Sequence, residues 1–567
     1  MTIAGGGIDS NEDIRKFYRA DADVRFNALG SHHIRFGYDR EELSSTSISQ
    51  GGGDGLSYNI FTAQAGNIYG IPVGTQYVRQ TRYVQSGQFA SLNEAYYLQD
   101  SWSLLGDRLN LNLGIRNDRF SNDNSLGETF YKSGNQWGPR LGFTFDPIGQ
   151  RRDKLYGSFS RMYLPVASNT NIRLTGGELF YTRTNIFGGL GAGNIPILGS
   201  AVFYPSATTC PDDNIRNCNV TGNGQPKSAE ATVSQNLKPQ SADEYILGYE
   251  KRLGDKWRIG AFFNYSKLNE VLEDSSIDAA INNYCVAQRI SGCGPIWGGF
   301  HQYVLINPGR GATVTLLDPI NGEATPRTVE FTAEQLGYPK AKRTYKAMTF
   351  EAHREFDGVW SLDASYTYSK TVGNYEGGVK TDNGQSDTGL TTDFDQPGLT
   401  LGTYGYSPND KRHAIKVAGS YQLGPVVLGA NLQAYAPRRY GCIGLVPGSV
   451  DPYAAAYGAA GLYCQVNADG SINSDPSVTS PVRQVRRGSV FKSDWSFVND
   501  VDIAYKFDVG SASMTLRASV FNVLNLKQKL NFDENGTNGE GVASAYYRTV
   551  TQYQAGRNAR LQLAFDF

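Results

Sequence analysis

The stretch that decides the fold is WRIGAFFNYS, residues 257–266, in which every second side chain belongs to an apolar set. Trp257, Ile259, Ala261, Phe263 and Tyr265 make up that set. The intervening positions are arginine, glycine, phenylalanine, asparagine and serine. Successive side chains of an extended strand point to opposite faces, so this period of two predicts a strand with one apolar face.

The same period recurs along the whole chain. No sustained period of 3.6 residues competes with it, so we expect an all-β protein with no helix longer than about two turns. Ile186–Tyr204, the most helix-like apolar segment, carries several glycines and a proline, and we expect a loop there. The clearest further runs of alternation are residues 109–116, 360–369, 500–507 and 560–567.

The length of these runs indicates a membrane barrel. A strand that crosses the outer membrane needs about 9–11 tilted residues, whereas strands of globular proteins average about 5–6. Residues 256–268 and 412–423 form runs of the longer kind. Aromatic residues such as Tyr265 and Tyr421 gather toward the run ends, as in interfacial girdles. The alternative is cross-strand packing in the core of a soluble sandwich.

Connections between the runs alternate between short and long. Bacterial outer-membrane barrels have short periplasmic turns and longer extracellular loops, so this alternation predicts which end of the barrel faces outward. The short turns lie at residues 30–31, 106–107, 147–153, 254–255, 357–358, 424–425 and 509–512. The long segments lie at about 45–75, 123–136, 166–239, 273–341, 373–408, 436–490 and 526–544.

Composition excludes several classes of protein. The 567 residues carry a net charge of -1, with 65 glycines, 35 tyrosines and 12% aromatic residues. This content is too aromatic for a disordered chain, and the mean hydropathy of -0.40 is too polar for a helical membrane protein. A near-neutral chain without a basic cluster argues against a nucleic-acid partner.

The six cysteines fall as close pairs, all inside long connections. An even number in local pairs predicts three disulfides in an oxidising compartment, and six free thiols are the alternative. The expected pairs are Cys210 with Cys218, Cys285 with Cys293, and Cys442 with Cys464.

Several motifs, in their order along the chain, resemble the TonB-dependent receptor family. NEAYYLQDSW (93–102) with LNLNLGIRND (109–118) resembles a barrel hairpin of that family. WGPRLGFTFDP (137–147) resembles a strand of its Oar-like branch, and Pro239–Tyr249 and FNVLN (521–525) are similar to later strands. The resemblance extends over nearly the whole chain.

The resemblance implies an antiparallel transmembrane β-barrel of the outer-membrane type. Counting back from Phe567 through seven short turns gives about 15 of the roughly 22 strands that such transporters have. We therefore expect residues 1–567 to be the C-terminal portion of the barrel domain, without the plug domain or the energy-coupling box. An odd strand count predicts an unclosed sheet, with the edge near residues 17–29 unpaired.

The family implies energised uptake of an unidentified ligand across the cell outer membrane of a Gram-negative bacterium. The implied partners are outer-membrane lipid, the barrel-insertion machinery, an extracellular ligand and, for the full-length protein only, an inner-membrane TonB-type coupling protein. Leu561, Leu563, Phe565 and Phe567 resemble the terminal signal that the insertion machinery recognises. No signal peptide is visible in Met1–Ile8.

Three other functions are open at this point. A passive porin-like channel would have an open lumen, and an Oar-like barrel could handle a protein substrate. A secreted enzyme on a β-scaffold would need clustered acid and base residues, which the sequence does not offer. We therefore expect no enzyme activity and no cofactor.

No catalytic or metal site is expected. His32 and His33 are adjacent and would point to opposite faces of a strand, so we expect solvated turn residues there. His301, His353 and His413 have no acidic or cysteine partners nearby in the sequence. Thr381–Asp387 is rich in oxygen ligands but lacks EF-hand spacing, and we expect a polar loop without calcium.

Ligand specificity is expected in the outer loops 166–239, 273–341 and 436–490. Exposed aromatic residues there could supply contact surface or simply pack the loops together: Phe180, Tyr181, Trp297, Tyr303, Tyr453 and Tyr457. Basic side chains of the lumen could steer an anionic ligand, but pairing with Glu244, Glu250 or Asp502 is the expected role of Arg116, Arg258, Lys416 and Arg517.

Overall fold

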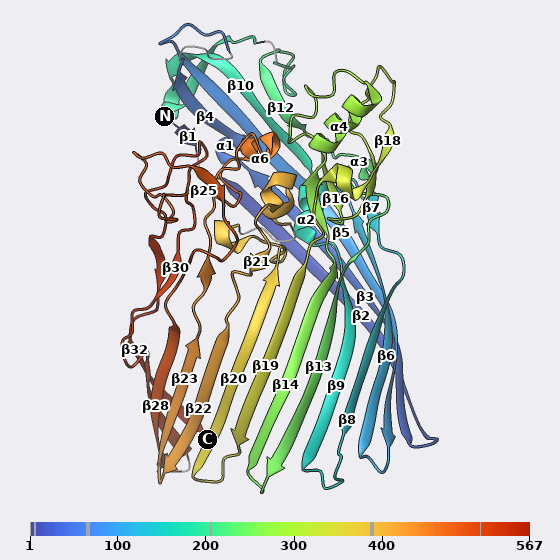
Figure 1. Ribbon diagram of the computed structural model, residues 1–567, viewed down its shortest axis with the longest axis vertical. Coiled ribbons are helices and arrows are strands. Elements are labelled where there is room, and N and C mark those ends of the chain that lie inside the picture. The colour runs from blue at the N-terminus through green and yellow to red at the C-terminus, as the bar shows by residue number, and fades with distance from the viewer. Residues whose placement is uncertain are drawn as a thin grey trace.

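The computed structural model describes residues 2–4, 7–63, 69–204, 207–385, 390–510 and 512–566. A long antiparallel meander forms a curved, tilted wall with hairpin turns at one end and loops at the other (Figure 1). Its strands in spatial order are β2 (Ile8–Asn27), β3 (Ser31–Gln50), β5 (Gln76–Leu104), β6 (Leu109–Asp123), β8 (Gln136–Phe145), β9 (Asp153–Leu164), β13 (Gln240–Leu253), β14 (Trp257–Glu270), β19 (Arg343–Arg354), β20 (Trp360–Gly373), β22 (His413–Leu423), β23 (Val426–Tyr435), β28 (Ser496–Val509), β29 (Ala512–Phe521) and β32 (Asn558–Asp566).

Register explains why these residues form a two-faced wall. Pairing across β22, β23, β28, β29 and β32 aligns one row of apolar side chains, which are Tyr421, Leu428, Ile503, Ala518 and Leu561. The neighbouring row, on the opposite face, is Ser420, Gly429, Asp502, Ser519 and Arg560. The apolar row is exposed on the outside of the curved wall, as the lipid-facing side of a membrane barrel requires.

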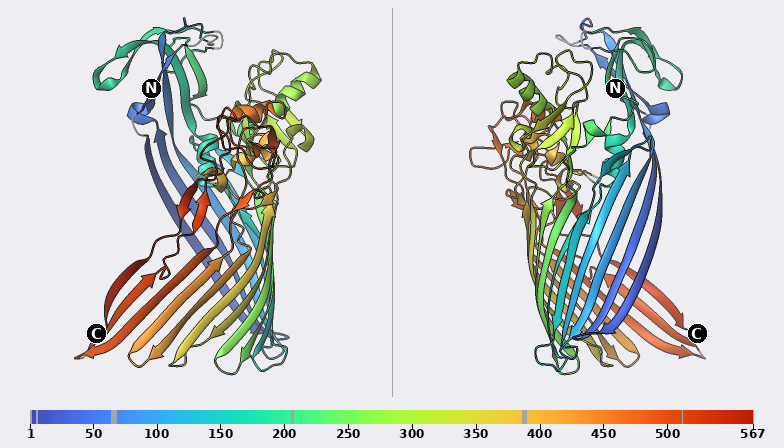
Figure 2. Two further views of the ribbon diagram at one scale, coloured as in Figure 1. Left: turned by 60° about the vertical axis from the view of Figure 1, so that its left-hand side comes forward. Right: turned by 90° about the vertical axis from the view of Figure 1, so that its right-hand side faces the viewer.

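The wall is open between its first and last strands. Among the described pairings, β2 is bonded to β3 alone and β32 to β29 alone. Figure 2 shows the blue strands of the N-terminal part apart from the red strands of the C-terminal part. The unpaired edge agrees with the expectation for residues 17–29, although β2 begins earlier, at Ile8. The number of strands in the wall, as named above, also agrees with the predicted number of about 15.

Several connections predicted as plain loops contain further strands. Ile186–Tyr204 is not a loop but lies mainly in a hairpin, in which Phe187 is opposite Leu198. The hairpin forms because the first strand is already fixed along the upper part of β5, a long-range pairing that local sequence does not reveal. These additional strands of the large sheet are β1 (Thr2–Ala4), β4 (Leu56–Thr62), β7 (Thr129–Lys132), β10 (Gly177–Leu190), β11 (Pro196–Ala201), β12 (Cys218–Asn223) and β21 (Gly405–Tyr406).

The loops also carry two-stranded ribbons that lie above the wall. They pair β15 (Glu273–Ser276) with β16 (Tyr303–Ile306), β17 (Ala312–Thr315) with β18 (Thr328–Phe331), β24 (Arg439–Tyr440) with β27 (Phe491–Lys492), β25 (Tyr463–Gln465) with β26 (Val482–Gln484), and β30 (Lys529–Phe532) with β31 (Val550–Tyr553).

One helix is longer than predicted. α4 (Asp278–Gln288) has 11 residues, about three turns, so the expected limit of two turns is wrong. Its buried face packs Ile281 into the largest apolar cluster, and Cys285 anchors its end. The other helices are α1 (Gly52–Gly55), α2 (Ser168–Thr175), α3 (Ala229–Thr232), α5 (Ala333–Leu336), α6 (Pro452–Tyr457) and the 3-10 turns η1 (Ala192–Asn194), η2 (Thr381–Asn383), η3 (Thr392–Phe394) and η4 (Pro397–Thr400).

The packed core belongs to the loops rather than to the wall. Trp297, Phe331 and Phe394 are almost fully buried and belong to one cluster formed by loops 273–341 and 373–408. The loops therefore form an ordered cap at one end of the wall.

No helix within the described ranges combines the length and apolar character needed to cross a membrane.

Candidate ligand-binding site at the loop end

A cavity of 1330 Å³ lies at the loop end, between the inner face of the wall and the loop cap. Strands β2, β3 and β5 supply one side, and α2 with β10 and β12 supplies the next. The third side comes from residues of loops 273–341, 373–408 and 436–490. Three loops far apart in sequence therefore share one cavity with the wall.

The wall side of the cavity is polar. Ser49 donates a hydrogen bond to Asp9 at 2.6 Å, and Ser47 donates one to Asn11 at 2.7 Å. These short side chains alternate along β2 and β3 with outward-facing residues, so the polar set of each strand lines the lumen. Asp13 lies on the same face.

The loop side combines carboxyl groups with aromatic rings. Tyr457 donates a hydrogen bond to Asp395, and burial raises the pKa of Asp395 to about 6. His301 Nε2 lies 2.5 Å from Asp318 Oδ2. Burial also raises the pKa of Tyr303 far above its usual value, so its hydroxyl stays a hydrogen-bond donor at neutral pH.

Carboxyl groups outnumber basic groups around the cavity. Besides His301 its lining has two basic side chains, Arg173 and Lys227, and burial lowers the pKa of Lys227. The six acidic side chains of the lining are Asp9, Asp13, Glu178, Asp274, Asp318 and Asp395. The cavity thus offers a ligand mainly hydrogen-bond acceptors and aromatic faces.

A buried charge network fixes the loop cap that forms this side. Arg487 pairs with Asp393 and lies 3.6 Å from Asp382, and all three side chains are nearly inaccessible. Burial opposes ionisation of Asp393, yet Arg487 and Lys380 hold its pKa below its ordinary value. The network joins loop 373–408 to loop 436–490.

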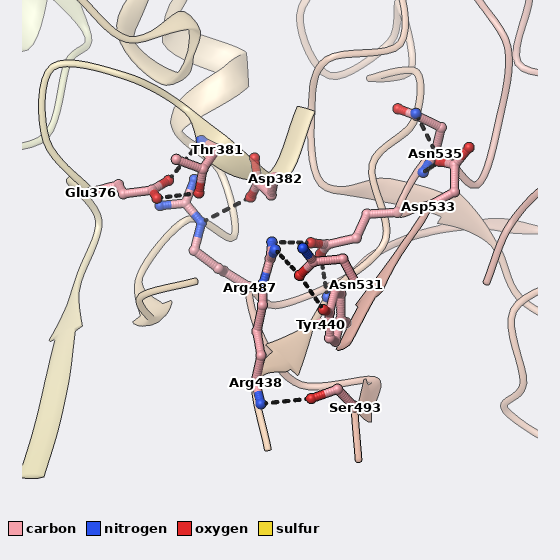
Figure 3. Close-up of polar contacts among 12 residues, drawn as sticks. Glu376, Thr381, Asp382, Arg438, Tyr440, Arg487, Ser493, Asn531, Asp533 and Asn535 are labelled. Atoms are coloured by element: carbon pink, nitrogen blue, oxygen red, sulfur yellow. Dashed lines mark hydrogen bonds and ion pairs between the residues drawn. The ribbon is translucent and has the colours of Figure 1, made fainter. Parts of the chain in front are cut away.

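A second group of contacts continues the network toward the last loop (Figure 3). Arg438 binds Glu534 at 2.8 Å and Asn531 at 3.3 Å. Tyr440 donates hydrogen bonds to Asn531 at 3.1 Å and to the Leu530 carbonyl at 2.7 Å. The last loop, predicted as 526–544, runs to residue 557 in the structure and is called loop 526–557. It is thereby tied to loop 436–490.

All six cysteines are disulfide-bonded in the expected pairs. The Cα separations are 5.1 Å for Cys210–Cys218, 6.5 Å for Cys285–Cys293 and 6.3 Å for Cys442–Cys464, which are ordinary for disulfides. Each bridge lies within one loop of the cap. The disulfides therefore stiffen single loops, whereas the charge network joins different loops.

The six aromatic residues predicted to be exposed divide into three pairs. Tyr303 and Tyr457 line the cavity. Tyr181 and Trp297 are 0% exposed, so the prediction of contact surface is wrong for these two. Both are large rings that the loops bury as their own core, Trp297 in the largest cluster and Tyr181 beside the Cys210–Cys218 disulfide.

Phe180 and Tyr453 also make contacts within the protein. Phe180 packs edge-on against Tyr83, with ring centroids 5.7 Å apart. Asn282 donates a hydrogen bond to the hydroxyl of Tyr453 at 2.7 Å. Both residues thus join loops to one another or to the wall.

The histidines have partners that the sequence did not indicate. His32 is not a solvated turn residue, because its ring stacks between Phe26 and Trp102 and its Nδ1 lies 2.7 Å from Asp100. His33 points to the other face, toward Asp23, as predicted.

The other two wall histidines also have cross-strand partners. His353 pairs with Asp363, and the Nδ1 atom of His413 lies 2.9 Å from the hydroxyl of Tyr366. These are pairs rather than clusters of metal ligands. Register brought the partners together across neighbouring strands, beyond the range of any local motif.

The oxygen-rich segment 381–387 makes protein contacts. Thr381 donates to Glu376, and Asp382 faces Arg487. Ser386 and Asp387 lie outside the described residues, as does Phe567 of the terminal segment. In the part of the chain that is described, the one grouping of possible metal ligands is Cys210 with Asp212 and Asp213, and that cysteine is in a disulfide.

Basic residues of the lumen are paired differently from the prediction. Arg116 binds Asp39 and Asp118, both at 2.7 Å. Arg517 does lie near the expected Asp502, at 3.8 Å.

For the other two basic residues, no ion pair is found among the described residues. Arg258 and Lys416 face the lumen, as expected, and both are exposed. Glu250, one of their expected partners, instead binds Lys154 at 3.2 Å.

Comparison with known proteins agrees with this architecture. The family described as "TonB dependent receptor-like, beta-barrel" matches residues 4–523. The TonB-dependent transporter Oar from Myxococcus xanthus is 29% identical over 437 residues, which cover 74% of this chain and 37% of that protein.

Solved structures are similar at lower identity. The siderophore receptor PirA from Acinetobacter baumannii has a TM-score of 0.40 and 12% identity, covering 98% of this chain and 62% of that chain. The outer membrane transporter YddB from Escherichia coli has a TM-score of 0.42 and 13% identity, covering 98% and 63%. The chain thus spans 37% of the length of Oar. On the family match over residues 4–523, this chain belongs to the TonB-dependent receptor β-barrel family.

Proposed function

We propose that this chain forms the barrel wall and ligand-binding cap of a receptor that takes up a ligand across the outer membrane, driven by an inner-membrane TonB-type protein. The observation that carries the proposal is the shared cavity, in which three outer loops and the inner face of the wall meet. A receptor that first captures its ligand needs such a site at the outer end of its lumen. The proposal assigns no catalytic step to the chain.

The outer face of the wall supports the proposed placement in the membrane. Leu428, Leu432 and Ile503 point outward and are more than two-fifths exposed, which suits a lipid-facing band. The short turns would then lie in the periplasm and the cap outside the cell. Leu563 and Phe565 on β32 belong to the same band and are proposed as part of the signal for the insertion machinery.

The test is energy-dependent uptake in the native host. Strains that lack either this gene or the TonB-type protein are compared on panels of nutrients and iron sources, and we expect the two strains to share one growth defect. The gene restores growth only when the coupling protein is present. A variant carrying Tyr303→Ala and Tyr457→Ala should fail to restore growth while reaching the outer membrane in normal amount.

A different outcome would identify a different class of protein. Restored growth without the coupling protein, together with steady conductance in planar bilayers, would show a passive porin-like channel. Absence of the chain from outer-membrane fractions would overturn the membrane placement itself.

A further inference from the structure

A second hollow, of 930 Å³, lies where β8, β9, β13 and β14 meet the loop cap and the segment just before β19. It is separate from the cavity proposed for the ligand, with which it shares no lining residue. Its charged lining comprises one carboxyl group, Glu270, and five basic side chains, which are Arg161, Lys238, Lys267, Lys340 and Lys342.

Register places the wall portion of this hollow on the outer face. Arg161 and Lys267 are both directly opposite Asp243 on their neighbouring strands, so the three side chains share a face. Lys267 also shares its face with Phe263, an outward residue that is 41% exposed. Tyr265 lies between these two in the same alternate series, so the order up the wall is apolar, aromatic and then charged.

Much of the positive charge in the hollow is uncompensated. Glu270 is bound by Arg310, whose Nε lies 2.9 Å from its carboxylate. No carboxylate in the described ranges lies within 4.0 Å of the ammonium groups of Lys238, Lys340 or Lys342. All three lysines are exposed, so their charges are available to a ligand.

Lys251, Lys256 and Arg354, at the turn end of the wall, are paired instead. Lys251 lies 3.1 Å from Asp153, and Asp357 binds both Lys256 and Arg354 at 2.6 Å. The carboxylates there neutralise the cations within the protein. Unpaired positive charge on this part of the outer wall therefore gathers at the loop end.

Two further lysines of the outer wall extend the positive zone beside the hollow. The Lys346 ammonium lies 5.4 Å from the ring centre of Tyr265, and the Lys370 ammonium lies 5.7 Å from that of Tyr406. The two lysines are directly opposite each other on β19 and β20. Lysines just above aromatic residues occupy the level at which lipid headgroups meet water.

We propose that this hollow binds the phosphate groups of a phosphorylated glycolipid in the outer leaflet of the membrane. The inference rests on the outer-membrane placement given under the proposed function. At that level, a hollow of this size accepts a sugar headgroup, and lysine ammonium groups bind phosphate by charge-assisted hydrogen bonds. The apolar band below is then in contact with the acyl chains of the same lipid.

The test compares the full chain with a variant carrying Lys238→Ala, Lys340→Ala and Lys342→Ala. Each protein is placed in phosphatidylcholine nanodiscs, and its binding of bisphosphorylated lipid A and of enzymatically dephosphorylated lipid A is measured. The full chain should prefer the phosphorylated lipid. At about 1 kcal/mol per lysine near a membrane surface, the variant should lose roughly 100-fold of that affinity.

A matched control removes three exposed cations from the lumen face, by Arg258→Ala, Lys416→Ala and Lys506→Ala. This control should keep the preference, which shows that position rather than net charge decides binding. Equal binding of both lipids by the full chain, or an unchanged preference in the hollow variant, would overturn the proposal. Inorganic pyrophosphate that binds the hollow as tightly as lipid A would overturn its assignment to a lipid.

This measurement is independent of transport. Loss of uptake in the growth test, with the lipid preference intact, would count against the proposed function and leave the lipid site standing. Loss of the lipid preference with uptake intact would count against the lipid site and leave the proposed function standing.

Discussion

Lys380 Nζ lies 2.9 Å from Asp393 Oδ1, and both side chains are fully buried. Lys380 also donates a hydrogen bond to the Ala460 carbonyl at 2.7 Å, so one ammonium group joins loop 373–408 to loop 436–490. Arg487 supplies the second cation to Asp393. The cap over the cavity is therefore held by charges removed from water, and removal of one partner has a large cost.

Replacing Lys380 with methionine should loosen the cap. The change keeps much of the side-chain volume but leaves Asp393 with a single cation, which costs about 3–5 kcal/mol. We expect faster hydrogen exchange throughout residues 373–385 and 436–490, with unchanged exchange in the wall. Lys416→Met, a change at an exposed residue of the lumen, serves as the control. Equal hydrogen exchange in the two variants would contradict this role for Lys380.

Stability of the last loop should depend on pH through Glu534. Burial raises the pKa of Glu534 to about 7, with Asp382 adding to the rise and Arg438 opposing it. The folded loop therefore binds the proton more tightly than the unfolded loop does. Its stability is greatest below the ordinary pKa of glutamate and falls as the pH rises from about 4.3 to about 7.

Substitution isolates this effect. Glu534→Gln should remove the pH dependence of protease resistance in residues 526–557. Resistance is compared at pH 5, which lies inside the window, and at pH 8, which lies roughly one unit above its upper end. The exposed Glu540→Gln serves as the control and should keep the dependence. A slope that survives in Glu534→Gln would assign the titration to another group.

The longest disulfide loop should contribute most to the stability of its own segment. Cys442 and Cys464 are 22 residues apart, against 8 for each other pair. Loop-closure entropy predicts a cost of about 3.4 kcal/mol for the double serine variant, and about 2.5 kcal/mol for a shorter loop. Unfolding of the cap is monitored by mass spectrometry of proteolytic fragments. The double serine variants should lose stability in that order, and the reverse order would contradict the prediction.

Neighbouring residues of β23 test the two faces of the wall. Leu432 points outward and is 48% exposed, whereas Gln433 faces the lumen. Leu432→Arg should destabilise the wall in a lipid bilayer by up to about 2–4 kcal/mol, whereas Gln433→Arg should cost far less. Urea titration in lipid vesicles measures the difference, and equal costs would refute the assignment of faces.

Local sequence contained most of the information for the wall. The alternation in residues 257–266 and the tight turns at 254–255 and 424–425 each act over a few residues, and the structure retains them. The length of β5 could not be predicted in this way. Its upper part is a strand because β4 and β10 pair with it, and both partners lie beyond sizeable connections.

The cavity and the cap were less accessible to sequence reasoning. His301 and Asp318, or Lys380 and Asp393, carry no motif, because each pair is defined by how the loops pack. From the sequence, Lys380 would be placed at the surface, because it is a lysine in a glycine-rich segment, yet it is fully buried. Tyr303 and Tyr457, two of the loop aromatic residues singled out from the sequence, do line the cavity. Burial of Tyr181 and Trp297 shows that ring content alone does not identify contact residues.

The length of β5 has a mechanical consequence. Its 29 residues span about 95 Å at roughly 3.3 Å per residue. Crossing a hydrocarbon core of about 30 Å at a tilt of about 45° uses only some 42 Å of that length. More than half of the strand therefore stands outside the bilayer, carrying β10 along its edge. A continuous hydrogen-bonded ribbon resists bending, so a force on its tip reaches the wall as it would through a lever.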